Sequence, residues 1–234
     1  MFGLNTELTV LLLLCIFIAC IFEFINGFHD TANAVATVIY TKSLKPLTAV
    51  IWSGIWNFVG VYVGGLAVAM GIINLLPVEA LVDANIYHNI SLILALILTA
   101  VIWNLGTWYL GIPCSSSHTL IGSIFGVGIA LLLITNGAQP TLNWKKIADA
   151  GLSLLISPVI GFFLAFLLMM LFKKVLNKDI FFKEPESKKA PPFGIRSILI
   201  LTSATVSLSH GSNDGQKGIG LLMIILICFL PAKL

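Results

Sequence analysis

Residues 24–34 read Phe-Ile-Asn-Gly-Phe-His-Asp-Thr-Ala-Asn-Ala and place amide, imidazole and carboxylate groups inside an apolar stretch long enough to cross a bilayer. A charged carboxylate at the centre of a membrane costs about 2.5 kcal/mol or more, so an intramembrane aspartate usually faces a wet cavity or a partner group. Asp30 therefore predicts a functional site within the membrane.

The residues around Asp30 also repeat with helical spacing. Steps of three and four place five polar side chains on one helix face: Glu23, Asn26, Asp30, Asn33 and Thr37. Gly27 is predicted to unwind the helix there and to expose backbone groups to a ligand. A polar seam that only holds helices together is the alternative, and two carboxylates on one face disfavour it.

The composition excludes the soluble globular class. Of the 234 residues, 58% are hydrophobic and 10% are charged, whereas about a quarter of a soluble domain is charged. The net charge of +3 comes from clustered bases, so binding of nucleic acid is not indicated. The cysteines lack metal-ligand spacing and are predicted to be packing residues: Cys15, Cys20, Cys114 and Cys228.

The hydropathy pattern predicts an all-α, polytopic membrane protein. One helical crossing needs about 20 apolar residues. The first span is predicted to be retained, because it has neither a basic segment before it nor a small-residue cleavage site. The predicted spans are 8–27 continuing as a broken segment to 40, then 47–72, 90–111, 118–135, 148–172, 195–209 and 216–231.

The basic residues predict the orientation of these spans, because cytoplasmic loops are enriched in lysine and arginine. Two bases follow the first span and seven crowd 173–196, whereas 73–89 has none. Nine of the thirteen bases then lie inside, with Lys145 and Lys146 as exceptions outside. The amino terminus is therefore predicted to lie outside.

An internal repeat follows the charged, proline-rich segment 173–194, which is predicted to be a cytoplasmic linker. Residues 27–33, Gly-Phe-His-Asp-Thr-Ala-Asn, align with residues 211–217, Gly-Ser-Asn-Asp-Gly-Gln-Lys. The two copies are predicted to cross the membrane in opposite senses, as in secondary transporters built from inverted repeats with discontinuous helices. The predicted units are a first repeat (1–172), the linker (173–194) and the start of a second repeat (195–234).

A third polar segment lies at 103–122. Trp-Asn-Leu-Gly-Thr-Trp (103–108) precedes a turn with Pro113 and a run of hydroxyls at Ser115, Ser116, Ser117 and Thr119. These residues suit a re-entrant turn at a helix amino terminus, which is a suitable site for an anion. An ordinary capped loop is the alternative. The glycines of 47–72 and 118–135, and Asn57, are better explained by close helix packing.

Together these segments resemble the inorganic phosphate transporters of the Pit type. The resemblance rests on "EFINGFHDTANAVATVIYT", "IWNLGTWYLGIPCSSSHTLIG" and "SHGSNDGQKGIGL", and it covers almost the whole chain. It implies low-affinity, cation-coupled symport of phosphate across the inner (plasma) membrane. Whether phosphate crosses as a metal-phosphate complex, and whether the protein is a homodimer, stay open. No cofactor, resident metal or enzyme activity is implied.

Carried over by position, the resemblance implies a set of substrate residues, and a second set is predicted to bind the coupling ion. The substrate set is Asp30, Asn33, Ser115, Ser116, Ser117, Thr119, Asn213 and Asp214. The coupling-ion set is Glu23, Asn26, His29, Asp30, Asn104 and Asp214. His29 and Lys217 depart from the commoner form of the motifs, and because imidazole is a poor sodium ligand, H+ is favoured over Na+ as the coupling cation.

Two interpretations compete with phosphate transport. One is a sulfate permease of the same fold. The other is an intramembrane serine hydrolase that uses His29, Asp30, His118 and the serines of 115–117, but the paired aspartate motifs do not require it. The family's second half should also repeat the spans after the motif, so the chain is expected to be a fragment or a truncated product.

Overall fold

The computed structural model describes residues 4–75, 86–135, 143–176 and 189–229, and the regular secondary structure of these residues is entirely helical. Five helices are long and apolar enough to cross a membrane, which confirms the prediction of an all-helical, polytopic membrane protein. The helices are α1 (Thr6–Tyr40), α2 (Pro46–Val63), α3 (Ala67–Ile73), α4 (Ile86–Tyr109), α5 (Ser116–Ile134), α6 (Trp144–Val175) and α7 (Phe193–Phe229).

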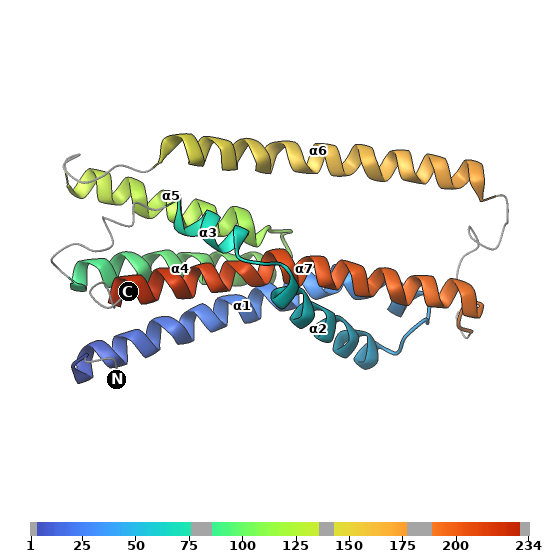
Figure 1. The fold of residues 1–234 in the computed structure, drawn as a ribbon, viewed down its shortest axis with the longest axis horizontal. Coiled ribbons are helices and arrows are strands. Elements are labelled where there is room, and N and C mark those ends of the chain that lie inside the picture. Colours follow the sequence, from blue (N-terminus) through green and yellow to red (C-terminus); the bar gives the residue numbers. More distant parts are fainter. Residues whose placement is uncertain (1–3, 76–85, 136–142, 177–188, 230–234) are drawn as a thin grey trace.

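Helices α1 and α7 extend along most of the molecule and run antiparallel (Figure 1). The Ser203 hydroxyl of α7 donates to the Ala34 carbonyl near the end of α1 at 2.8 Å. Further along α7, Gly218 lies against Glu23, which comes earlier in α1. At 1.5 Å per residue, their 35 and 37 residues correspond to about 50 and 55 Å. The two aspartate motifs therefore lie on long antiparallel helices, and the inverted repeat stays a prediction.

The helix breaks differ from those predicted. Helix α1 is continuous through Gly27, so the predicted break there is wrong; the Thr31 hydroxyl donates to the Gly27 carbonyl at 2.6 Å and the helix is kept. The predicted spans 195–209 and 216–231 are one helix, α7. The predicted span 47–72 is instead divided into α2 and α3 by residues 64–66, where Gly65 has a φ of 70° that favours glycine.

Helices α4 and α5 form a hairpin that occupies one half of the long axis, and their connecting turn lies near the middle of the molecule (Figure 1). The turn bends at Gly111, whose φ is 67°, and the Ile112 amide donates to the Thr107 carbonyl at 2.9 Å. The Ser115 hydroxyl accepts from the His118 amide at 3.4 Å and caps α5. The hydroxyl turn thus reaches the middle of α7.

Two apolar clusters support this arrangement. The larger joins the first half of α1 to α3, α4, α5 and the second half of α7; it includes Leu12, Phe22 and Leu221. The smaller joins the end of α1 to α2 around Val38 and Ala49. The polar motifs lie between the two clusters, so packing on both sides positions them.

The four cysteines occupy three kinds of environment. Cys15 and Cys228 are buried in the larger cluster, which confirms them as packing residues. Cys20 is exposed. Cys114 is different: its sulfur lies 3.6 Å from Asn104 Oδ1 and 3.2 Å from the Thr119 hydroxyl, so it belongs to the polar turn.

Glycines bring α2 and α7 into backbone contact. A Cβ at Gly211 would collide with the Asn57 carbonyl oxygen, and one at Gly64 would lie 2.7 Å from Ser212 Cβ. The Asn57 side chain donates to the Ser53 carbonyl at 3.1 Å, and the Ser53 and Ser207 hydroxyls are 2.9 Å apart. Among the glycines predicted to pack closely, Gly60 and Gly64 are confirmed, because a Cβ at either would meet the backbone of α7. A Cβ at Gly54, Gly65, Gly122 or Gly126 would have no described neighbour within 4 Å, so the prediction is wrong for these four. The packing role of Asn57 stays a prediction.

Helix α6 contacts the other helices near its amino end, where the Trp144 ring lies 5.8 Å from that of Phe125. None of its residues is buried, and its last turn carries Lys173 and Lys174, which interact favourably with the helix dipole. The predicted linker 173–194 begins inside this helix, and its residues 177–188 lie outside the described part. The division into two repeats stays a prediction.

Candidate functional site

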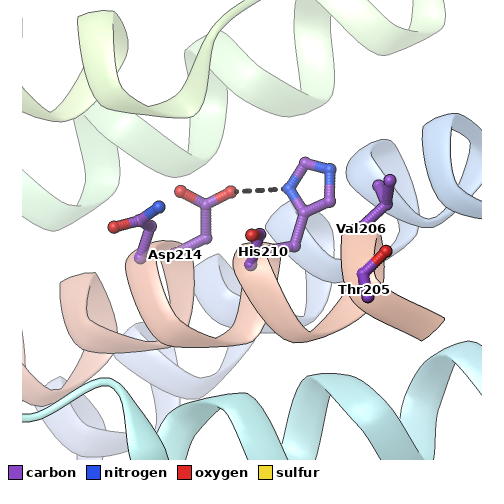
Figure 2. A pocket seen from close by; sticks show the side chains of 6 residues that line it. Thr205, Val206, His210 and Asp214 are labelled. Atoms are coloured by element: carbon purple, nitrogen blue, oxygen red, sulfur yellow. Dashed lines mark hydrogen bonds and ion pairs between the residues drawn. The ribbon is translucent and has the colours of Figure 1, made fainter. Parts of the chain in front are cut away.

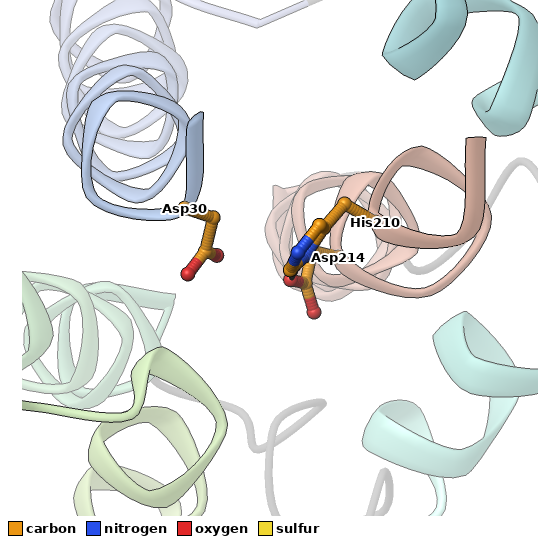
Figure 3. Close-up of side chains that lie close together, drawn as sticks. All are labelled: Asp30, His210 and Asp214. Carbon is orange, nitrogen blue, oxygen red and sulfur yellow. Dashed lines mark hydrogen bonds and ion pairs between the residues drawn. The ribbon is translucent and has the colours of Figure 1, made fainter. Parts of the chain in front are cut away.

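Three ionisable side chains meet where α1 and α7 cross. One ligand atom each of Asp30, His210 and Asp214 lies within 4.8 Å of the others, and Figure 3 shows the Asp30 carboxylate opposite the two α7 side chains. The His210 Nδ1 is 3.3 Å from Asp214 Oδ2 (Figure 2). The two aspartates that the repeat predicted therefore share one site.

Lys217 connects this cluster to the hydroxyl turn. Its ammonium nitrogen is 2.6 Å from Asp214 Oδ1 and donates to the Ser116 hydroxyl at 2.7 Å. The lysine is only 5% exposed, and a buried charge is stable only when it is paired and hydrogen-bonded. The positive charge is thus fixed between a carboxylate of α7 and the first residue of α5.

A pocket of about 420 Å³ lies beside the cluster and is bounded by α1, α2 and α7. Glu23, Asn26, Asp30 and Asp214 all line it, and Asn26 is 3% exposed. Glu23 Oε1 and Asn26 Oδ1 are buried without a hydrogen-bond partner among the described residues. Such atoms are costly unless a ligand, ion or water satisfies them.

Other predicted residues surround the cluster at different depths. Asn213 lines a second pocket of about 460 Å³ with His210 and Asp214. Thr119 and Asn104 are buried in the α4–α5 hairpin and both contact Cys114. They support the turn, and no hydrogen bond of theirs reaches the aspartates in the part of the chain described.

Four predicted residues are not brought into the cluster. Asn33 is exposed, because beyond Asp30 the buried face of α1 is that of Ala34 and Val38. Ser115 is exposed as the cap of α5, and Ser117 is half-buried without a described contact to the aspartates. The His29 ring packs on Phe28 at 5.0 Å and lines neither described pocket.

Sequence reasoning missed His210 and left Lys217 without a role. Both lie on the Asp214 face of α7, at steps of four and three residues. The helical periodicity that groups the polar residues of α1 would have found them if it had been applied to residues 203–217. Ser203 and Ser207, which continue this spacing, are buried.

The charged groups of the cluster suit both a cation and an anion. The ligand oxygens of Asp30 and Asp214 lie within 4.8 Å of each other. Two ionised carboxylates at that distance or less repel by about 3 kcal/mol or more at an effective dielectric constant of 20, and Lys217 offsets part of this repulsion. Asp30, His210 and Asp214 also offer an oxygen and nitrogen ligand set that suits a divalent cation. The amino end of α5 and the Ser116 hydroxyl suit an anion.

These features define a polytopic helical membrane protein with a charged site in its interior. The chain belongs to the phosphate transporter family, whose profile matches residues 26–232.

Individual relatives agree with this assignment. The chain is 45% identical to a low-affinity inorganic phosphate transporter of Buchnera aphidicola over 96% of its length and 48% of the relative's. It is 43% identical to the low-affinity inorganic phosphate transporter PitB of Escherichia coli K12 over 98% of its length and 48% of the relative's. It is 39% identical to a probable low-affinity inorganic phosphate transporter of Bacillus subtilis over 94% of its length and 60% of the relative's.

The chain spans about half the length of the first two relatives. No solved structure matches it. The relatives are named as transporters, which points to a protein that is not an enzyme. Among the described residues no hydrogen bond joins a serine hydroxyl of the turn to a histidine ring, because Ser115 accepts from the backbone amide of His118 and Ser116 from Lys217, so the hydrolase interpretation gains no geometric support.

Proposed function

We propose that the protein is a low-affinity inorganic phosphate transporter of the inner membrane and that the junction of α1, α5 and α7 binds the anion. The observation that carries this proposal is the 2.7 Å bond between Lys217 and Ser116, which places an ammonium group at the amino end of a helix. Hydroxyls, free amide groups and a fixed positive charge are the groups that bind phosphate elsewhere.

The coupling cation belongs to the same site. Two carboxylates beside a phosphate dianion require compensating positive charge, and Glu23, Asn26 and Asp30 place oxygen atoms on the pocket. We favour H+ over Na+, because the cluster contains the imidazole of His210 beside Asp214, and imidazole accepts a proton near neutral pH and is a poor ligand for sodium. Transport of a metal-phosphate complex would use Asp30, His210 and Asp214 for the metal.

Uptake of radiolabelled phosphate tests this proposal. Cells that lack other phosphate uptake systems are expected to accumulate phosphate when they express the protein, and a large excess of sulfate should leave the rate unchanged. Uptake should depend on pH and not on sodium. Equal inhibition by sulfate would favour the sulfate permease, and uptake that ignores both pH and sodium would contradict cation coupling.

Ser116→Ala is expected to raise the half-saturating phosphate concentration about tenfold or more. One hydrogen bond to a charged acceptor contributes about 1.5 to 3 kcal/mol, and the variant loses the Ser116 hydroxyl that bonds to Lys217. Ser157→Ala is the matched control, since this hydroxyl lies on exposed α6 and bonds to the Ser153 carbonyl. If Ser116→Ala keeps the wild-type affinity for phosphate, the turn only caps α5 and does not bind the anion.

The proposed topology has the amino terminus outside and the two motifs inverted. The antiparallel course of α1 and α7 supports the inversion. In a cysteine-free background, Lys174→Cys at the end of α6 should be labelled by impermeant thiol reagents only from the cytoplasmic side. Lys145→Cys, at the other end of α6, should be labelled only from outside. Labelling of both from one side would overturn the orientation.

A further inference from the structure

We propose that Lys217 is a built-in counter-cation: its ammonium group permanently takes the place of one dissociable cation beside Asp214 and turns its remaining N–H toward the bound anion. The inference rests on the proposed function, because the anion in question is phosphate. It adds a specific role for a residue that the paired aspartate motifs do not explain.

The geometry accounts for two of the three ammonium donors. One is directed to Asp214 Oδ1 at 2.6 Å and another to the Ser116 hydroxyl at 2.7 Å. An ammonium group has three donors and no acceptor. Among the described residues the third donor has no hydrogen-bond partner, so it is available beside the amino end of α5.

Ser116 is oriented by the same bond. Its oxygen accepts from Lys217, so its own hydroxyl proton is free to donate to an anion. Ser116 is also the first residue of α5, where backbone N–H groups have no acceptor within the helix. The lysine thus holds a hydroxyl donor and a helix end in one anion-binding arrangement.

The carboxylates around the pocket explain why a lysine side chain, rather than a dissociable ion, supplies the positive charge. Glu23, Asp30 and Asp214 line one pocket, and Lys217 is the one lysine or arginine that is buried among the described residues. Without it, Asp214 would face Asp30 with His210 as its remaining described partner. A further dissociable cation would then be needed before phosphate could bind.

Chemical rescue of Lys217→Ala tests this role in the purified protein. Equilibrium dialysis with radiolabelled phosphate should give wild-type binding that is the same in sodium and choline buffers. In choline buffer, Lys217→Ala should bind about tenfold or more weakly, which corresponds to about 1.4 kcal/mol or more. Propylammonium, which restores the missing amine, should recover binding, and tetramethylammonium, which cannot donate hydrogen bonds, should not.

Matched variants make each outcome decisive. Lys145→Ala, at an exposed position, should bind as the wild type does. If Lys217→Ala does not fold, Lys217→Arg should keep phosphate binding in choline buffer and Lys217→Met should lose it. Undiminished binding by Lys217→Ala or Lys217→Met, or a folded alanine variant that propylammonium does not restore, overturns the inference. Failure of the wild type to bind phosphate would instead reject the proposed function.

Discussion

Asp214→Asn is expected to reduce phosphate uptake to background while the protein still inserts into the membrane. The carboxylate pairs with Lys217 at 2.6 Å and lies 3.3 Å from His210, so its loss leaves a buried ammonium without its counter-charge. Breaking a buried ion pair in this way costs about 3 to 5 kcal/mol. Insertion should not suffer, since removing an intramembrane charge makes insertion easier.

Asp30→Asn should have the same effect on uptake through the opposite helix. This carboxylate lies on α1 and contributes the other aspartate of the cluster. Asp149→Asn is the control for both variants, because Asp149 is exposed on α6. Uptake by cells is the measurement, with the amount of protein in the membrane determined by immunoblot. Normal uptake by either variant would show that the aspartate it replaces does not belong to the phosphate site.

Gly211→Val is expected to lower the thermal stability of the protein strongly. A Cβ at this position collides with the Asn57 carbonyl oxygen and lies 2.8 Å from its Cα, and this neighbour is backbone that cannot rotate away. Overpacking typically costs about 1 to 3 kcal/mol, and a valine adds two methyl groups to the collision. The melting temperature in detergent should therefore fall well below that of the wild type.

Gly27→Ala provides the matched comparison. It is also a helical glycine in a polar motif, but nothing lies within 4 Å of an added Cβ. Replacement of glycine by alanine in a helix contributes about 1 kcal/mol of stability, so the melting temperature should stay level or rise. If Gly211→Val melts at the wild-type temperature, the close contact between α2 and α7 is wrong.

The sequence predicted the chemistry of the site better than its geometry. Asp30 and Asp214 could be paired because each follows a glycine by three residues in apolar sequence. Ser116 could be placed at a helix start because proline and serines mark such turns. None of these patterns indicates which helices touch, so the bond between Ser116 and Lys217 could not be predicted.

The wrong predictions also arise because local sequence patterns do not show which helices pack together. Gly27 permits a break in a helix but does not require one, and α1 remains helical there. Asn33 repeats with the spacing of Asp30, but packing at Ala34 and Val38 decides which face of α1 is buried beyond the site. Local spacing identifies candidate faces, and tertiary contacts select among them.

The most direct measurement locates the anion. Arsenate has the shape and charge of phosphate and can be found by its anomalous scattering in a crystal of the protein. The proposed site predicts an arsenate oxygen about 3 Å from the Ser116 hydroxyl, close to the Lys217 ammonium. Arsenate bound elsewhere, with this junction empty, would contradict the proposed phosphate site.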